Sequence, residues 1–298
     1  MLKRTLFFGS PHHLKTKNNQ LIAINKETGL IKQIPIEDIG FIVFEHPALS
    51  FTQSVLQLLN ENNTAVIFCN KQYLPTSMLL NLDSNHVQSE MFRYQIDASQ
   101  PLKKQLWQQT IKQKIRNQAQ HLKQLGKNEI PLLKFATNVL SNDVTNQEAR
   151  AAKYYWKYMF ENIDFRRDRF GDFPNNLLNY GYIILRSAVA RALVSSGLLP
   201  TLGIHHHNKY NAFCLADDII EPYRPFVDKI VLQIMDEEKD ITELTPAIKA
   251  KLLGILTIDI SINKNKRPLM VGLSETTASL AQCFKGTRKI IKYPVLCD

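Results

Sequence analysis

The spacing of apolar residues changes after about residue 85, and no other feature constrains the fold of this 298-residue chain as strongly. Before that point apolar residues form short runs of strand length, and beyond it they recur every three or four positions. Continuous or alternating runs favour strands, whereas a period of about 3.6 residues favours helices. We therefore predict an α+β protein with a β-rich domain in residues 1–85 and a larger α-helical domain in residues 86–298.

The N-terminal domain is predicted to contain short strands around a single helix. The predicted strands are residues 21–24, 30–34, 41–44 and 65–68. The first two flank a turn in which Gly29 can adopt the positive φ of a hairpin bulge. The last two are continuous apolar runs, which is typical of strands buried on both faces. A helix that Ser50 or Thr52 can cap is expected between them.

The C-terminal domain is predicted to be mostly helical. The predicted helices are residues 102–122, 132–140, 147–160, 177–196, 218–235 and 275–284. Gly126 and Gly197 follow two of them where a C-terminal cap is expected. A small hairpin is expected from residues 255–262 and 269–271, which flank the polar turn 263–267. Lys112, Lys114 and Arg116 share a predicted helix whose other face is apolar, so we expect them mostly at the surface.

Charge is distributed unevenly between the two domains. Residues 1–85 hold 7 of the 37 basic and 6 of the 27 acidic residues, so most of the formal charge of +10 belongs to the helical domain. Such an excess attracts polyanions, including nucleic acids, although a single basic cluster is more often an ordinary solvated surface. The apolar content of 44% excludes a mainly disordered chain.

The sequence predicts a cytoplasmic protein without a membrane segment. No apolar run reaches the ~18 residues of a membrane span, and Pro11, His12 and His13 interrupt any signal-like apolar stretch near the start. The four cysteines have no paired spacing, so we expect reduced thiols and no zinc finger. They are Cys69, Cys214, Cys283 and Cys297.

Two segments of the helical domain each carry a candidate ligand and a structural alternative. Thr145-x-x-Glu148 fits a capping box, in which Glu148 binds the Thr145 amide, but Glu148 could instead ligate a metal. In the run His205–His207, adjacent side chains of an extended chain point to opposite faces, so one ion cannot readily collect all three. Each imidazole could equally be a hydrogen-bonded structural residue.

A third segment places three carboxylates within five residues: Asp217, Asp218 and Glu221. Acidic residues at a helix N-terminus are stabilised by the helix dipole, which is the structural interpretation. Like charges held this close also repel, and a divalent cation relieves that repulsion. Carboxylates with one neutral imidazole suit Mg²⁺ or Mn²⁺ better than structural zinc.

Together these segments resemble the CRISPR-associated adaptation integrases, the Cas-one family, most closely its type II branch. The resemblance rests on four motifs in order: NQEARAAKYYW from Asn146, NLLNYGY from Asn176, GIHH from Gly203, and DIIEPYRPFVD from Asp218. Residues 34–40 (IPIEDIG) and 275–281 (ETTASLA) are also similar. The resemblance covers nearly the whole chain.

The resemblance implies a fold and a set of site residues. It implies an N-terminal β-sandwich-like domain used in dimerisation and an all-α C-terminal domain that is catalytic and binds DNA. The family's metal-binding and catalytic residues correspond to Glu148, His206 and Glu221, with Asp218 as a possible second acidic residue. The run of three histidines allows a slip of one position, so His205 and His207 stay alternatives to His206.

The resemblance also implies an activity and partners. Family members are metal-dependent DNA endonucleases and integrases: a protospacer 3′-hydroxyl attacks a phosphodiester of the CRISPR repeat, with Mg²⁺ or Mn²⁺ as cofactor. A homodimer is implied, two of which clamp the small Cas-two partner in a heterohexamer. The type II effector nuclease and an accessory ring protein are further expected partners. The alternatives are a general metal-dependent nuclease acting on branched DNA in repair, and a non-enzymatic DNA-binding scaffold.

Basic residues that could contact the DNA backbone occur in three clusters of the helical domain. They are Arg166, Arg167 and Arg169, then Lys264, Lys266 and Arg267, then Arg288 and Lys289. Such contacts would position DNA without reading its sequence.

Overall fold

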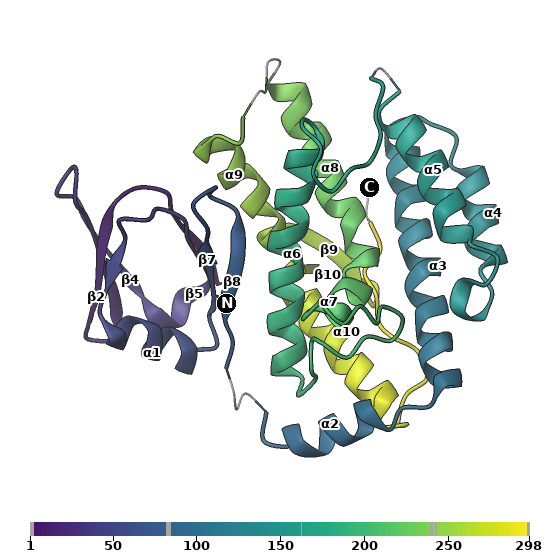
Figure 1. Cartoon of the computed structure of the whole chain (residues 1–298), viewed down its shortest axis with the longest axis horizontal. Helices are drawn as coiled ribbons and strands as arrows, with labels where there is room; N and C mark the ends of the chain where they lie inside the picture. The colour runs from purple at the N-terminus through teal and green to yellow at the C-terminus, as the bar shows by residue number, and fades with distance from the viewer. Residues whose placement is uncertain (1–2, 82–84, 162, 239–240, 242, 297–298) are drawn as a thin grey trace. The chain divides into compact units, whose positions relative to one another are not determined.

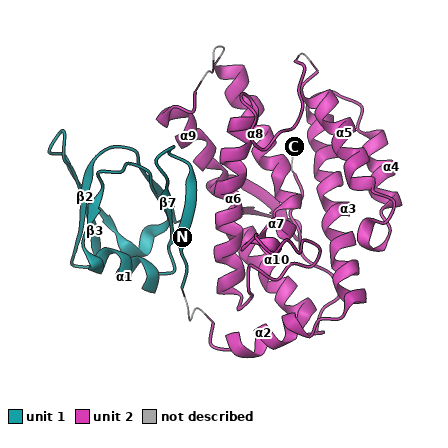
Figure 2. Cartoon of the chain, viewed as in Figure 1, with its two compact units in different colours: residues 1–84 teal, residues 85–298 magenta. Residues whose placement is uncertain are grey.

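The computed structural model describes residues 3–81, 85–161, 163–238, 241 and 243–296. The chain divides into two compact units, residues 1–84 and 85–298 (Figure 2). The first is built mainly of strands and the second mainly of helices (Figure 1), which confirms the predicted α+β class. Residues 82–84, next to the predicted domain boundary, and Cys297 lie outside the described residues.

The described part of unit 1, residues 3–81, forms two four-stranded sheets and one helix. One sheet has the order β1-β5-β7-β8, with β8 antiparallel to β7, and the other has the order β4-β3-β2-β6. The strands are β1 (Arg4–Phe8), β2 (His12–Lys17), β3 (Gln20–Asn25), β4 (Ile31–Pro35), β5 (Ile39–Phe44), β6 (Ser50–Phe51), β7 (Ala65–Cys69) and β8 (Pro75–Leu79), with a 3-10 turn at Ile36–Asp38 and helix α1 (Gln53–Glu61). Leu21 of one sheet, Ile42 of the other and Val55 of α1 share one apolar core, so the unit is sandwich-like.

The four predicted strands of unit 1 are present, whereas β1, β2, β6 and β8 were not predicted. β3 and β4 form the expected antiparallel hairpin, with Gly29 at φ +71°, and all six residues of β5 are buried. β2 has only one fully buried side chain, Leu14, so its sequence carries little apolar signal. Asn18 and Asn19, at φ 50° and 56°, join it to β3 in a tight turn that favours asparagine.

The described residues of unit 2 form helices and one small hairpin. The helices are α2 (Gln88–Ile96), α3 (Gln100–Gln124), α4 (Ile130–Asn138), α5 (Gln147–Met159), α6 (Asn175–Ser195), α7 (Cys214–Ile219), α8 (Arg224–Glu237), α9 (Pro246–Leu253) and α10 (Leu269–Phe284). 3-10 turns lie at Ser141–Asp143, Glu221–Tyr223 and Gly254–Thr257. β9 (Asp259–Ile262) and β10 (Asn265–Pro268) form the hairpin that was predicted in this region, so the domain is mainly rather than entirely α-helical.

Two predicted boundaries in unit 2 were wrong, and prolines explain both. The helix expected over 218–235 is divided into α7, the 3-10 turn Glu221–Tyr223 and α8, because Pro222 has no N–H to donate to the carbonyl four residues earlier. Residues 269–271, expected as a strand, begin α10 instead, since Pro268 ends the β10 ladder. Helices α2 and α9 were not predicted.

Helix α6 is the central helix of unit 2 and contacts α7, α8, α9 and α10. By length and composition α6 could cross a membrane, contrary to our expectation that no segment could, but 72% of its apolar window is buried inside the protein. Gly181 permits close packing: a Cβ there would lie 2.5 Å from Cγ1 of Val227 on α8. Among the described cysteines, Cys69, Cys214 and Cys283 are free thiols, as predicted.

Candidate metal centre

Helix α3 is buried on more than its apolar face. The predicted apolar side chains Ile111 and Ile115 are fully buried. A second, polar row at helical spacing is buried too: Lys114, Asn117 and His121 are 9%, 0% and 1% exposed. The expectation that Lys114 lies at the surface was therefore wrong. A buried ammonium needs compensating charge, so the surroundings of Lys114 identify the charged centre of this unit.

Lys114 joins two of the predicted ligands. Its Nζ lies 2.5 Å from Oε1 of Glu148 and 2.6 Å from Oε2 of Glu221. Arg224 completes the group, with Nε 2.9 Å from Oε1 of Glu221. The four charges thus alternate in sign from Glu148 through Lys114 and Glu221 to Arg224. Throughout, this group of four is called the charged cluster.

Mutual attraction keeps Lys114 and Glu221, the two buried residues of the charged cluster, ionised. Burial alone lowers the pKa of Lys114, but Glu221 and Glu148 raise it by more, so the net shift is upward. Burial likewise raises the pKa of Glu221, and Arg224 and Lys114 outweigh it, so the net shift is downward. Each buried charge is therefore held by a neighbour of opposite sign.

Glu148 is available to the charged cluster because another residue caps its helix. Both carboxylate oxygens of Asp143 accept α5 amides, from Gln147 and Glu148, at 2.9 Å. The capping box of Thr145 and Glu148 does not form, since Asn146, which would have to begin the helix, stands at φ 52° in left-handed backbone. The carboxylate of Glu148 turns to Lys114 instead.

Glu221 is positioned by the proline-interrupted turn between α7 and α8. Asn117 of α3, one helical turn after Lys114, donates from Nδ2 to the carbonyl oxygen of Pro222 at 2.7 Å. This hydrogen bond fixes the turn against α3. As a result Glu221 is only 5% exposed and lies directly beside Lys114.

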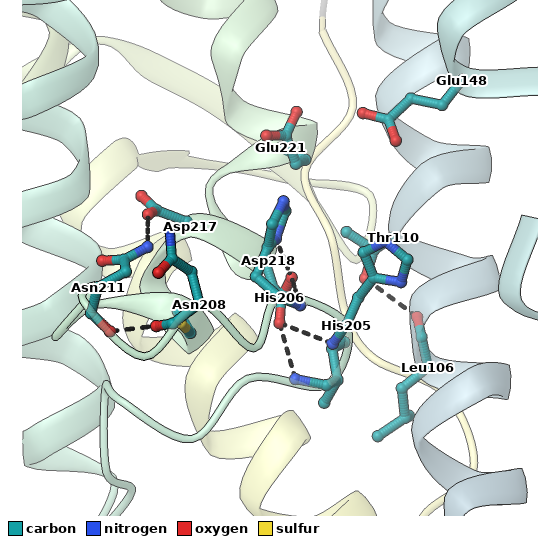
Figure 3. Close-up of polar contacts among 12 residues, drawn as sticks. Leu106, Thr110, Glu148, His205, His206, Asn208, Asn211, Asp217, Asp218 and Glu221 are labelled. Carbon is teal, nitrogen blue, oxygen red and sulfur yellow. Dashed lines mark hydrogen bonds and ion pairs between the residues drawn. The ribbon is translucent and has the colours of Figure 1, made fainter. Parts of the chain in front are cut away.

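The three consecutive histidines have three different environments. Nδ1 of His206 lies 2.6 Å from Oδ1 of Asp218, and its ring extends from Asp218 toward Glu221 (Figure 3). This hydrogen bond to Asp218 raises the pKa of His206 and outweighs the opposite effect of burial. His205 instead stacks on Trp107, with ring centroids 4.1 Å apart and planes 1° from parallel. His207 is exposed.

Asp218 is fully buried and fixes the loop that carries these histidines. Its Oδ2 accepts the amides of Ile204 and His205 at 2.7 and 3.0 Å, and its Oδ1 accepts the His206 amide at 3.2 Å. Gly203 allows the loop to approach this closely, because a Cβ there would lie 2.3 Å from the His206 carbonyl oxygen. Both oxygens of Asp218 are therefore engaged by the histidine loop.

The structure thus brings some of the predicted site residues together and separates others. Glu148 and Glu221 meet at Lys114, with His206 oriented toward Glu221 (Figure 3). Asp218 lies behind His206, and Asp217 pairs with Asn211 at 2.7 Å and with Arg186 at 3.7 Å. Within the described ranges, no three His, Cys, Asp or Glu side chains are arranged to hold a metal ion. The ammonium of Lys114 lies between the two carboxylates.

Comparison with known proteins identifies the family. The family model described as "CRISPR associated protein Cas1" matches residues 6–244. The chain belongs to the Cas1 family. This is the Cas-one family that the motifs predict. The CRISPR-associated endonuclease Cas1 of Neisseria meningitidis serogroup C is 35% identical over 282 residues, which are 94% of this chain and 91% of that Cas1 protein.

Solved structures show the same fold at lower identity. A casposase bound to integration product superimposes with a TM-score of 0.80 at 18% identity, over 98% of this chain and 92% of the casposase. A chain of a Cas6-RT-Cas1–Cas2 complex gives a TM-score of 0.71 at 20% identity, over 96% of this chain and 35% of that one. The architecture of this Cas1 chain is therefore shared well beyond its sequence relatives.

The basic residues predicted to contact DNA lie on three other elements of this Cas1 chain. Arg166 and Arg169 are exposed, whereas the Arg167 guanidinium donates to Oδ1 of Asn175 and Asn179 at 3.0 and 2.6 Å. Lys264, Lys266 and Arg267 are exposed on the β9–β10 hairpin, Lys289 is exposed, and Arg288 is half-buried. Arg167 thus holds its own loop to α6, and of the exposed side chains Arg267 lies 3.8 Å from Oε1 of Glu275.

Proposed function

We propose that this Cas1 protein is a metal-dependent DNA endonuclease and integrase of CRISPR adaptation, which inserts protospacer DNA into the array. The reaction is attack of a protospacer 3′-hydroxyl on a phosphodiester of the CRISPR repeat. The observation that carries the proposal is the meeting of Glu148 from α5 and Glu221 from the α7–α8 turn at one buried cation. Two carboxylates from distant segments repel each other at close range unless positive charge lies between them.

The side chains present fit Mg²⁺ or Mn²⁺ by their donor chemistry. Glu148 and Glu221 would supply oxygen ligands and His206 a nitrogen ligand, which are donors that these ions accept. The hydrogen bond from Nδ1 to Asp218 leaves Nε2 of His206 as the available nitrogen. A carboxylate behind a ligating histidine is the usual arrangement that fixes ring orientation in metal sites. We therefore propose His206 as the nitrogen ligand and Asp218 as its positioning residue.

When bound, the ion supplies Lewis-acid chemistry, which lowers the pKa of an attacking hydroxyl and neutralises charge at phosphorus. The protein supplies positioning. Arg224 holds Oε1 of Glu221, and Asn117 holds the turn that carries it. Trp107 stacks on His205 and thereby fixes the residue before His206. Because one phosphodiester is exchanged for another, the joining reaction needs no nucleoside triphosphate as an energy source.

The exposed basic side chains of unit 2 are proposed to hold the DNA backbone. Arg166 belongs to the wall of a cavity of about 460 Å³, which Lys153, Lys157, Trp156 and Phe165 also line. Cationic groups beside aromatic rings are the combination that binds DNA through phosphate contacts and base stacking. Lys264, Lys266 and Lys289 offer further positive charge on two other elements.

We propose the family's assembly for this chain as well: a homodimer formed through unit 1, two of which bind the small Cas2 protein in a heterohexamer. Support comes from the Cas6-RT-Cas1–Cas2 complex, which contains a chain of the same fold. The type II effector nuclease and accessory ring protein stay proposed partners, and we place the protein in the cytoplasm.

The experiment that tests this function compares two DNA substrates. Purified protein with the Cas2 partner and Mn²⁺ is given a duplex with 3′-hydroxyl ends and a supercoiled plasmid that carries a CRISPR repeat, or a four-way junction alone. We expect joined product at the repeat. Cleavage of the junction without joining would favour the general repair nuclease, and binding without either reaction would favour the scaffold.

A further inference from the structure

Lys114 is the residue of the charged cluster that the proposed chemistry does not use. It projects from α3, is 9% exposed, and contacts both proposed carboxylate ligands. Ordinary packing does not explain a lysine here, because burying an ammonium costs free energy unless opposite charge compensates it. Its position between Glu148 and Glu221 is also where a shared cation is needed.

The contacts leave few free oxygens for an ion. Both oxygens of Glu221 lie within ion-pair distance of a cation, Oε1 at 2.9 Å from Nε of Arg224 and Oε2 at 2.6 Å from Nζ of Lys114. Oε1 of Glu148 is engaged by Lys114 at 2.5 Å. Mg²⁺ binds carboxylate oxygens at about 2.0–2.1 Å, so an ion that shared these oxygens with the ammonium would be within ~5 Å of a like charge.

We propose that Nζ of Lys114 occupies the place of the divalent ion in the ion-free protein and leaves that place when the ion binds. This inference rests on the proposed function, because it needs Glu148 and Glu221 to be ion ligands. Lys114 is thus a positioning residue: it holds the two carboxylates together before the ion arrives and competes with the ion afterwards.

Lys114, rather than Arg224, is the group that moves. Arg224 is held by its ring contact as well as its charge, since its guanidinium carbon lies 4.6 Å from the ring centroid of Tyr182. Lysine carries a compact ammonium on a flexible four-carbon stem and can withdraw without disturbing its helix. Arg224 can then keep Oε1 of Glu221 while Oε2 becomes available.

The test measures Mn²⁺ binding to full-length protein stripped of ions, by electron paramagnetic resonance of free Mn²⁺, together with the thermal midpoint. Lys114→Met removes the competing ammonium. We expect Mn²⁺ affinity to rise about tenfold, which equals about 1.4 kcal/mol. We also expect the ion-free midpoint to fall, because the two carboxylates then repel each other. Lys112→Met, on the same helix and outside the charged cluster, should leave both quantities unchanged. Unchanged or weaker Mn²⁺ binding by Lys114→Met would overturn the proposal.

A second variant decides the question if Lys114→Met does not fold. Lys114→Arg keeps the charge and adds a planar fork that can hold both carboxylates. We expect weaker Mn²⁺ binding with an ion-free midpoint that is kept or raised, and wild-type affinity would contradict the inference. Glu148→Gln separates the two levels of argument. If Glu148→Gln binds Mn²⁺ as the wild type does, the proposed metal centre itself fails, whereas normal dependence on Glu148 with no effect of Lys114 refutes only this inference.

Discussion

The carboxylate of Asp218 holds the imidazole of His206, with Oδ1 2.6 Å from Nδ1, and it also accepts the three backbone amides of residues 204–206. One fully buried side chain therefore sets both the path of the histidine loop and the orientation of its second ring. This arrangement explains how a run of three similar residues can present one imidazole toward Glu221 while its neighbour stacks on Trp107.

Asp218→Asn should weaken Mn²⁺ binding and also lower the free energy of unfolding. An amide nitrogen cannot accept the backbone and imidazole hydrogen bonds that Asp218 accepts, so the His206 ring loses its fixed orientation. Loss of such a partner typically reduces metal affinity by about 10–100-fold, and the unfolding free energy should fall by about 1–3 kcal/mol. Mn²⁺ titration and urea unfolding measure these effects. Wild-type Mn²⁺ affinity in a folded Asp218→Asn protein would contradict the role of Asp218.

Gly203→Ala should disturb the same loop by steric means alone. The new Cβ would lie 2.3 Å from the His206 carbonyl oxygen and 2.8 Å from Oδ2 of Asp218, so one of these groups must shift. We expect a loss of about 1–3 kcal/mol, the usual cost of overpacking, together with weaker Mn²⁺ binding. Gly254→Ala is the matched control, because a Cβ at Gly254 has no heavy atom within 4 Å. Equal stability of the two variants would show that the close approach at Gly203 is unimportant.

Arg166 and Arg167 are neighbours in sequence, yet their substitutions should have different effects. Arg166→Ala removes an exposed charge, so DNA affinity should fall evenly across sequences and the slope of log affinity against log salt should decrease by about 1. Arg167→Ala removes hydrogen bonds to Asn175 and Asn179 and should reduce the unfolding free energy by about 1–3 kcal/mol. Fluorescence anisotropy with labelled duplex and urea unfolding separate them. A destabilised Arg166→Ala with unchanged DNA binding would reverse the assignment.

Acid should destabilise the protein through His121. Its Nδ1 lies 2.6 Å from the Tyr155 hydroxyl, and burial together with Lys229 lowers its pKa to about 3. The unfolded chain then binds a proton that the folded chain does not. The stability from neutral His121 is therefore present above its ordinary pKa of 6.5 and is lost as pH falls toward 3, by about 1.4 kcal/mol per pH unit.

Urea unfolding at two pH values checks this expectation. Between pH 7 and pH 5 the wild type should lose about 2 kcal/mol more than His121→Gln, which keeps a polar group near Tyr155 but does not titrate. Comparison with the variant removes the opposite contribution of Asp228, whose burial raises its pKa to about 7. A wild type and a variant that respond equally to pH would contradict a neutral, buried His121.

The sequence was enough to select Glu148 and Glu221 as candidates. Each lies in a motif, and the order of these motifs along the chain is similar to that of the Cas1 family. The division of the predicted helix 218–235 also had a local signal in Pro222 and Pro225. Lys114 had none. Its helix has an apolar face that is easily recognised, and its polar row is buried only because α5 and the α7–α8 turn, both remote in sequence, pack against it.

The other differences have the same physical origin. Asp143 rather than Thr145 caps α5, because the chain before the helix adopts positive φ at Asn146. The role of Asp218 depends on the path of a loop that is fixed by contacts with residues 204–206. Local sequence patterns identify the residues that can form charged contacts. Packing between segments that are distant in sequence determines which partners those residues contact.

Strand transfer by Glu148→Ala tests the central claim most directly. The Glu148 side chain is partly exposed, so its loss should leave the fold and duplex binding intact. We predict that the wild type joins a 3′-hydroxyl duplex to a repeat-carrying plasmid only with Mg²⁺ or Mn²⁺, and that Glu148→Ala joins none. Glu237→Ala, an exposed glutamate on α8, should join at the wild-type rate. Ion-dependent joining by Glu148→Ala at the wild-type rate would contradict the account.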